Sequence, residues 1–328
     1  MELKLQRGDK IGFFSPSSPI TAIVPTRFER AKEFLKEKGY ILVEGTQTGK
    51  SDFYRSGTIE ERAKELNILL RDPEIKCIIS TIGGLNSNSL LPYIDYEAFK
   101  KNPKIIIGYS DVTAILLGIY AKTGITTFYG PALVASFGEF PPFVEETFSY
   151  FEDILIKKSN LPYQYKKPEF WTDEMIDWKQ QDRSKILLKN EWITLKEGKV
   201  TGRVIGGNLS TIMGFWGSQY MPEIKKGDIL FIEDSLKTAA IAERNFSFLK
   251  VNGILDKVGG IIIGKHEKFD TQGTGRKYYE IFQEVAGELE IPILAEFDCC
   301  HTHPMFTLPL GATIELDTIN QKVTLLEQ

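Results

Sequence analysis

Short runs of β-branched residues alternate with longer amphipathic stretches between residues 10 and 150. This alternation is typical of parallel strands that are connected by helices lying on both faces of a sheet. The predicted strands are Lys10–Phe14, Tyr40–Glu44, Cys77–Ile82, Lys104–Ile107 and Thr126–Tyr129. The predicted helices include Pro25–Lys38, Ile59–Arg71 and Val112–Lys122. This half of the chain therefore predicts a doubly wound parallel sheet.

The pattern changes after residue 150 and resumes near residue 200. Little periodicity is present between these points, where Trp171 and Trp178 stand among polar residues, so we expect a connector that could carry function. Beyond it the predicted strands are Thr201–Gly206, Asp228–Glu233, Gly259–Gly264, Ile291–Phe297, Ala312–Leu316 and Val323–Leu326. The predicted helices there are Thr238–Val251 and Arg276–Leu289.

We therefore predict an α/β protein with two domains and a connector. Residues 1–165 form a flavodoxin-like or class I amidotransferase-like domain, residues 166–195 the connector, and residues 196–328 a smaller α/β domain with a barrel-like sheet.

Composition narrows the class of function. The formal net charge is -4 and the basic residues are scattered, which argues against a nucleic-acid partner and favours a small-molecule substrate. No signal-peptide core and no apolar stretch of membrane-spanning length is present. Three cysteines, too few for a disulfide framework, fit a reducing compartment, so we expect a cytoplasmic protein.

The strongest local signal is the segment from Lys104 to Asp111, in which a buried strand runs through Gly108 and Tyr109 into Ser110. A strand that turns sharply into a helix is the geometry of a nucleophile elbow, where a backbone N–H and the helix dipole face a developing oxyanion. Ser and Asp are equally typical of helix N-caps, so the local sequence leaves nucleophile and cap open.

A second candidate is the Gly83-Gly84 pair, which follows the strand that ends at Ile82. Because parallel strands end at one edge of a sheet, these glycines should lie beside Ser110 and could donate an N–H to an oxyanion. A tight turn into a helix explains the same residues.

A serine nucleophile needs a base, and His301 and His303 directly follow a buried strand. With Cys299 they could instead bind zinc, although the spacing lacks the separated pairs of known zinc sites. Cys300 as nucleophile is disfavoured, because its neighbour His301 would point to the opposite side of a strand.

Glu233 ends an apolar strand and could orient the imidazole, or it could simply begin a helix. Lys237 could meet an anionic group of a substrate or pair with a surface carboxylate. Trp171 and Trp178 could stack on a flat ring or pack the connector against a domain.

Together these residues resemble the LD-carboxypeptidase-like serine peptidases over nearly the whole chain. The matching motifs are Gly8-Asp9-Lys10-Ile11, Ser15-Pro-Ser-Ser, Thr81-Ile-Gly-Gly84, Asn102 to Asp111, Tyr129-Gly-Pro131, Gly206-Gly-Asn208, Phe231-Ile-Glu-Asp234, Gly264-Lys-His-Glu267, His301-Thr-His-Pro304 and Thr307-Leu-Pro-Leu-Gly311.

The resemblance implies a catalytic triad of Ser110, Glu233 and His301. It also implies an oxyanion hole from the N–H groups of Asp111 and of Gly83 or Gly84, an active site between two domains, a homodimer, and no metal or other cofactor. Cys300 departs from the small residue that more often precedes the histidine, which puts the local packing in doubt.

Within the family, the segments around Glu233 and His301 look like the branch of microcin C immunity proteins. That branch implies hydrolysis of the amide between an acidic aminoacyl group and a nucleotide-like moiety, with Asn208, Lys237 and Trp171 or Trp178 as candidate substrate contacts. The alternatives are cleavage of the L,D-peptide bond of murein tetrapeptide, a zinc-dependent hydrolase, and a ligand-binding sensor without catalysis.

Overall fold

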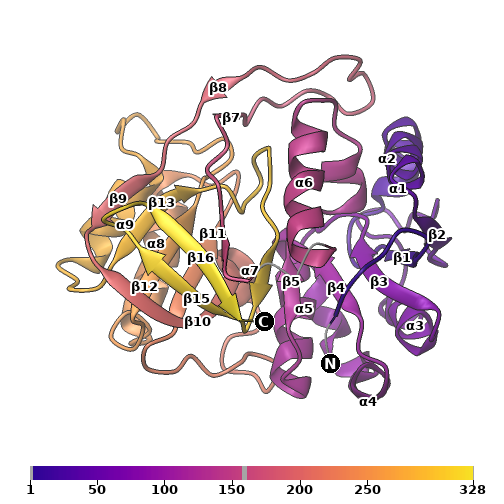
Figure 1. Cartoon of the computed structure of the whole chain (residues 1–328), viewed down its shortest axis with the longest axis horizontal. Helices are drawn as coiled ribbons and strands as arrows, with labels where there is room; N and C mark the ends of the chain where they lie inside the picture. The colour runs from indigo at the N-terminus through magenta and orange to yellow at the C-terminus, as the bar shows by residue number, and fades with distance from the viewer. Residues whose placement is uncertain (1–2, 157–160, 328) are drawn as a thin grey trace.

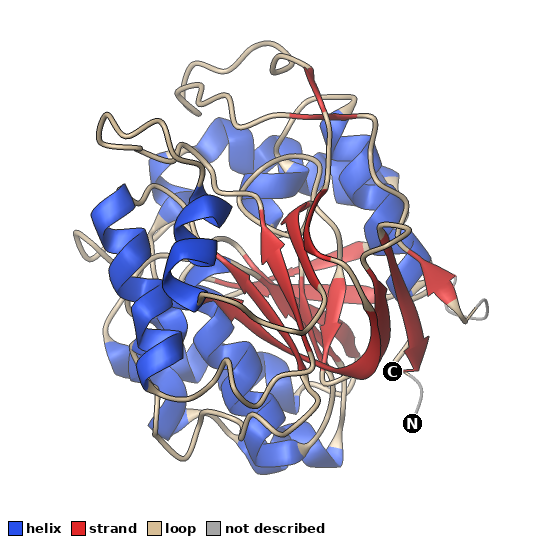
Figure 2. Cartoon of the chain, turned by 90° about the vertical axis from the view of Figure 1, so that its left-hand side faces the viewer, coloured by secondary structure: helices blue, strands red, loops and turns tan. Residues whose placement is uncertain are grey.

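The computed structural model describes residues 3–156 and 161–327. The N-terminal half, indigo to magenta, and the C-terminal half, orange to yellow, lie on opposite sides of the molecule (Figure 1). Figure 2 shows most of the strands gathered at the centre of the molecule, with helices packed around them, while a few strands lie at the top and at the right-hand edge. Each half therefore has its own sheet, and the two sheets are neighbours.

The first sheet has six strands in the order β2-β1-β3-β4-β5-β14. The first five are parallel, and β14 pairs antiparallel with β5. The order 2-1-3-4-5 is that of flavodoxin-like sheets, in which ligands bind beyond the carboxyl ends of the strands. The bounds are β1 Lys10–Phe14, β2 Ile41–Glu44, β3 Ile75–Ser80, β4 Ile105–Gly108, β5 Thr127–Tyr129 and β14 Leu308–Leu310.

Helices cover this sheet, and several of their ends follow from the sequence. The α3 helix begins at a capping box between Thr58 and Glu61, α2 has Pro25 in its first turn, and α5 ends at Gly124 in the left-handed conformation. The bounds are α1 Ile20–Ile23, α2 Pro25–Glu37, α3 Ile59–Arg71, α4 Tyr96–Lys101, α5 Thr113–Thr123 and α6 Phe143–Leu155, with short helices η1 Ser87–Tyr93, η2 Ser110–Val112 and η3 Leu133–Phe137.

The second sheet has eight strands in the order β6-β16-β15-β10-β11-β12-β13-β9. Its centre, from β10 to β13, is parallel, and its flanks are antiparallel. The strand bounds are β6 Tyr163–Gln164, β9 Ile193–Lys196, β10 Lys199–Asn208, β11 Ile229–Glu233, β12 Gly260–Gly264, β13 Ile293–Phe297, β15 Thr313–Asp317 and β16 Lys322–Glu327. The helices are α7 Leu209–Met213, α8 Ala239–Val251 and α9 Tyr278–Ala286.

The predicted fold class is confirmed, since both sheets form with their helices and the arrangement matches a solved relative. The predicted boundaries of the helices and strands agree with the observed ones within a few residues. One strand is shifted, because β3 begins at Ile75 rather than Cys77 and ends at Ser80, after which the chain leaves the sheet toward Gly83.

Two short strands each pair with the sheet of the other half of the chain. β6, which lies before residue 165, pairs with β16 in the second sheet, while β14 from the C-terminal half pairs with β5 in the first. The domain boundaries at 165 and 196 stay a prediction. Within the connector, β7 Phe170–Trp171 pairs with β8 Leu188–Lys189 in a small two-stranded ladder, and β9 begins at Ile193 and pairs with β13.

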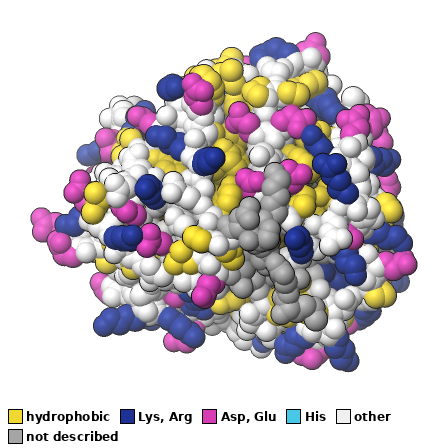
Figure 3. Space-filling view, viewed as in Figure 1, with side chains coloured by type: hydrophobic (Ala, Val, Ile, Leu, Met, Phe, Trp, Pro, Cys, Tyr) yellow, Lys and Arg dark blue, Asp and Glu magenta, His cyan; other side chains and the backbone are white. Residues whose placement is uncertain are grey.

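In the part of the chain that the structure describes, no helix combines the length and the apolar character needed to cross a membrane. Acidic and basic side chains are interspersed over the face shown in Figure 3, in keeping with the formal net charge of -4.

Candidate active site

Ser110 stands at a sharp turn between β4 and α5. Its φ of 61° lies in the left-handed region that a serine rarely adopts, which indicates a turn held by its surroundings. No side chain caps η2 or α5, and the Ser110 hydroxyl contacts an imidazole instead. The interpretation of Ser110 as a helix cap is therefore wrong.

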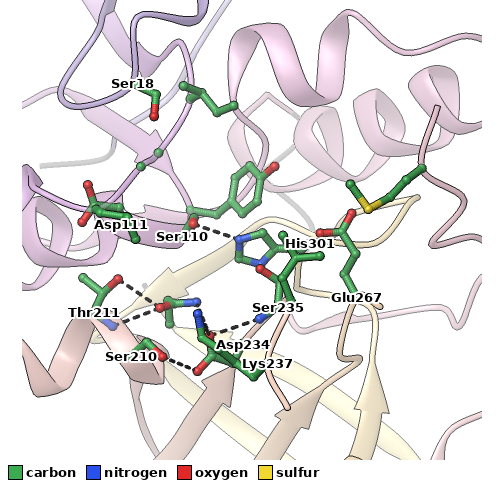
Figure 4. A pocket seen from close by; sticks show the side chains of 18 of the residues that line it. Ser18, Ser110, Asp111, Ser210, Thr211, Asp234, Ser235, Lys237, Glu267 and His301 are labelled. Atoms are coloured by element: carbon green, nitrogen blue, oxygen red, sulfur yellow. Dashed lines mark hydrogen bonds and ion pairs between the residues drawn. The ribbon is translucent and has the colours of Figure 1, made fainter. Parts of the chain in front are cut away.

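His301 follows β13 and contacts two of the predicted partners. Its Nε2 lies 2.8 Å from Ser110 Oγ, and its Nδ1 lies 2.6 Å from Glu233 Oε2 (Figure 4 draws the first contact). Because an ionised carboxylate only accepts hydrogen bonds, Nδ1 carries the proton and Nε2 presents a lone pair to the serine hydroxyl. His301 can therefore accept the proton of Ser110.

Glu233 is the last residue of β11 and is fully buried. Its Oε1 accepts hydrogen bonds from the Tyr129 hydroxyl at 2.5 Å and from Asn208 Nδ2 at 2.9 Å. Burial opposes its ionisation, but the charge of His301 and these hydrogen bonds outweigh burial and hold the pKa of Glu233 below its ordinary value. Burial alone would lower the pKa of His301. The charge of Glu233 and its hydrogen bond have a larger effect in the opposite direction, so the pKa of His301 is raised above its ordinary value.

The backbone of Gly83 lies against the serine. A Cβ at this position would be 2.9 Å from Ser110 Cβ and 3.1 Å from the backbone nitrogen of Asp111, so only glycine allows this approach. Gly84 has a φ of 151°, and a Cβ there would overlap Ser17. Asp111 stands in the first turn of η2, where N–H groups lack intrahelical partners.

The carboxylate of Asp111 fixes that loop. Its Oδ2 accepts hydrogen bonds from the backbone N–H of Asn86 and of Ser87, both at 2.9 Å, and from the Ser87 hydroxyl at 2.6 Å. Asp111, the acid beside Ser110, thus orders the segment that follows Gly83 and Gly84.

Ser110 and His301 open into a cavity of about 440 Å³, which is within the range of small-molecule sites. Figure 4 shows residues of both halves around it, with Ser18 and Asp111 on one side and Asp234, Lys237 and Glu267 on the other. The predicted oxyanion residues Gly83, Gly84 and Asp111 all line it.

The four candidate substrate contacts differ. Trp178 lines the cavity, and the Arg27 guanidinium lies over its ring at 4.3 Å from the centroid. Lys237 also lines it and lies 3.5 Å from Asp234. Asn208 lines it but is mostly buried and holds Glu233. Trp171 is absent from this lining and belongs to a neighbouring depression beside Lys265.

The zinc hypothesis requires a cluster of ligand side chains. Among the described residues no group of three or more His, Cys, Asp and Glu side chains is arranged to hold a metal ion. Cys299 is buried and its thiol contacts the backbone carbonyls of Tyr129 and Phe306, while the Cys300 thiol contacts Thr302. Burial raises the pKa of both thiols, so neither is a nucleophile of the kind that a low pKa would provide.

Sequence reasoning missed three residues. Tyr129 holds Glu233, and Lys185 and Glu267 line the cavity. Tyr129 and Glu267 each lie in a motif that matched the family, Tyr129-Gly-Pro131 and Gly264-Lys-His-Glu267, whereas Lys185 lies in none of the matching motifs.

An α/β fold that joins a serine hydroxyl, an imidazole and a buried carboxylate defines the class of serine hydrolases. Two sequence-family models match the chain, the LD-carboxypeptidase N-terminal domain over residues 11–130 and the LD-carboxypeptidase C-terminal domain over residues 201–316. The chain belongs to the LD-carboxypeptidase family and is a hydrolase of the serine peptidase type.

Relatives in this family are similar over nearly their whole length. A protein of Vibrio cholerae that is named as a carboxypeptidase is 61% identical, with 95% of this chain and 94% of the relative covered. The microcin C7 self-immunity protein MccF of Escherichia coli is 57% identical, with 98% and 94% covered. Structures of MccF with aspartyl sulfamoyl adenosine and with glutamyl sulfamoyl guanosine each give a TM-score of 0.98 at 56% identity, covering 100% of this chain and 98% of MccF.

Proposed function

We propose that the protein hydrolyses the amide bond between an acidic aminoacyl group and a nucleotide-like moiety, and so detoxifies microcin C-like compounds. The observation that carries the proposal is the hydrogen-bonded series Ser110–His301–Glu233 at the edge of a cavity of about 440 Å³. The substrate class is supported by the sulfamoyl nucleosides in complex with MccF.

The proposed reaction begins with attack of Ser110 Oγ on the amide carbonyl carbon, while His301 Nε2 takes the hydroxyl proton. Glu233 stabilises the imidazolium. The oxyanion of the tetrahedral intermediate accepts hydrogen bonds from the N–H of Asp111 and of Gly83 or Gly84. His301 then protonates the leaving nitrogen, and water hydrolyses the acyl group from Ser110 by the same proton route in reverse.

Two side chains are proposed to select the substrate. Trp178 would stack on the purine with the ring face that Arg27 leaves uncovered, and Lys237 would meet the phosphate-like group. The position of Trp171 outside the cavity favours Trp178 of the two tryptophans.

Cleavage of the L,D-peptide bond of murein tetrapeptide is the second candidate. It is favoured by the description of both family models as LD-carboxypeptidase domains. Ser110 would be the nucleophile in both reactions, so the catalytic residues do not distinguish the two candidate substrates.

Product analysis tests both candidates. Wild type and Ser110→Ala are incubated with aspartyl-sulfamoyl adenosine and with murein tetrapeptide, and products are identified by mass. We expect wild type to release aspartate and sulfamoyl adenosine, and Ser110→Ala to lose about 10⁴-fold or more of this turnover. Release of D-alanine by wild type in place of aspartate would favour the murein substrate, and undiminished turnover by Ser110→Ala would refute the mechanism.

We further propose that the enzyme acts in the cytoplasm as a homodimer. The three cysteines are free and buried, which fits a reducing compartment, and family resemblance supports the dimer. Light scattering on the purified protein would give the mass of two chains, and a monomer at micromolar concentration would contradict the dimer.

A further inference from the structure

Tyr129 joins the two halves of the proposed triad. It ends β5 of the first sheet, is completely buried, and its ring packs edge-on against Phe231 of β11 at a centroid distance of 5.2 Å. Its hydroxyl accepts a hydrogen bond from the backbone N–H of Ser110 at 3.0 Å and donates one to Glu233 Oε1 at 2.5 Å. One atom thus contacts both the nucleophile's backbone and the acid.

The direction of these two hydrogen bonds is fixed by chemistry. A phenol has one proton, and an ionised carboxylate can only accept, so the Tyr129 proton must point to Glu233 and its lone pair to Ser110. Burial and the neighbouring Glu233 charge raise the pKa of Tyr129 well above its ordinary value, which keeps that proton in place.

The arrangement has two consequences for the reaction. The bond to Ser110 N–H helps to hold the serine at a φ of 61°, the conformation that presents its Oγ to His301. The bond to Glu233 withdraws charge from the carboxylate that faces His301, and so tunes how strongly the imidazole holds its second proton.

We propose that Tyr129 is a positioning residue of the reaction, one that fixes the backbone of Ser110 and sets the basicity of His301 through Glu233. The role rests on the triad proposed above. Tyr129 is absent from the cavity lining, so it acts on catalysis rather than on substrate binding.

The test compares Tyr129→Phe with wild type, using steady-state turnover of aspartyl-sulfamoyl adenosine from pH 5 to 8. We expect kcat to fall about tenfold to a hundredfold with KM unchanged, as for loss of a hydrogen bond to a charged group. The acid-side midpoint of kcat should move to higher pH, because Glu233 without its donor attracts the imidazolium proton more strongly.

Tyr165→Phe is the matched control. Tyr165 is also buried, and its hydroxyl donates to the backbone carbonyl of Thr307 at 2.8 Å, away from the triad. The Tyr165→Phe substitution should lower Tm and leave the pH dependence of kcat unchanged. If Tyr129→Phe folds poorly, 3,5-difluorotyrosine at position 129, a stronger donor, should shift the midpoint to lower pH.

The outcomes separate the two claims. Loss of turnover in Ser110→Ala together with an unchanged kcat and pH profile in Tyr129→Phe would overturn only the role of Tyr129. Undiminished turnover in Ser110→Ala would overturn the triad itself, and with it the inference on Tyr129.

Discussion

Proton transfer in the proposed mechanism depends on the charge of His301. The imidazole must be neutral to accept the Ser110 proton, and the raised pKa of His301 means that it protonates at a higher pH than an ordinary histidine. Activity should therefore be present at alkaline pH and fall as pH decreases, with a midpoint above about 6.5, the usual histidine value.

The pH dependence of kcat/KM between pH 5 and 9 checks this prediction. Glu233→Gln is the informative variant, because it removes the charge that raises the pKa of His301 while keeping nearly the same shape. Its midpoint should move to lower pH and its kcat should fall. A flat profile between pH 5 and 8 in wild type would contradict the role of His301 as base.

At the scale of single residues, the sequence identified side chains that follow buried strands. Ser110, Glu233 and His301 each come at or after a strand end, and motif order raised them above the cap and metal alternatives. Tyr129 was not identified, because its function depends on a contact with Glu233, which is 104 positions away. Periodicity within one segment contains no information about such a pairing.

At the scale of elements, the connector is held by a buried charge cluster around Glu139. This carboxylate lies 3.1 Å from Arg27 and 3.5 Å from Lys185, and it accepts a hydrogen bond from Gln181. Arg27 also covers Trp178, so the cluster anchors the connector where it faces the cavity. Buried Arg and Lys side chains are rare, and the sequence alone would put them on the surface.

Glu139→Gln should therefore destabilise the protein. Removing one member of a buried ion pair leaves Arg27 and Lys185 without their counter-charge, a loss of about 3–5 kcal/mol. His303, Arg27 and Lys185 overcome the effect of burial and lower the pKa of Glu139 to about 2. The ionised Glu139 therefore stabilises the fold fully at pH values above its pKa in the unfolded chain, about 4.3. This stabilisation is lost as the pH falls toward 2.

Thermal unfolding of wild type and Glu139→Gln at pH 7 and at pH 3 measures this effect. The difference in Tm should be large at pH 7 and smaller at pH 3. Glu97→Gln is the control, because Glu97 pairs with Lys100 on the surface and its side chain is 71% exposed. An equal Tm for Glu139→Gln and wild type at pH 7 would disprove the anchoring role.

At the scale of the molecule, the two sheets interlock. β14 from the C-terminal half completes the first sheet, and the backbone N–H of Asn208 donates to Thr113 Oγ1 at 3.0 Å across the boundary. The sequence predicted both sheets but not this exchange, because strands of two or three residues such as β6 and β14 are too short to carry a recognisable pattern.

We therefore expect the two halves to unfold as one cooperative unit. All four tryptophans, Trp171, Trp178, Trp192 and Trp216, lie in the connector and the C-terminal half, so their fluorescence reports that part, whereas far-UV circular dichroism reports both halves. The two midpoints in urea should coincide. Separate midpoints would show that the halves are independent.

The proposed mechanism depends on Ser110 as the nucleophile. Its most direct test is labelling with a fluorophosphonate, a reagent that reacts with serines activated by a base, followed by peptide mass spectrometry. The proposed mechanism predicts one label on Ser110, loss of aminoacyl-sulfamoyl adenosine hydrolysis in proportion to labelling, and almost no label in His301→Ala. Label on another residue, or full turnover by the completely labelled protein, would contradict it.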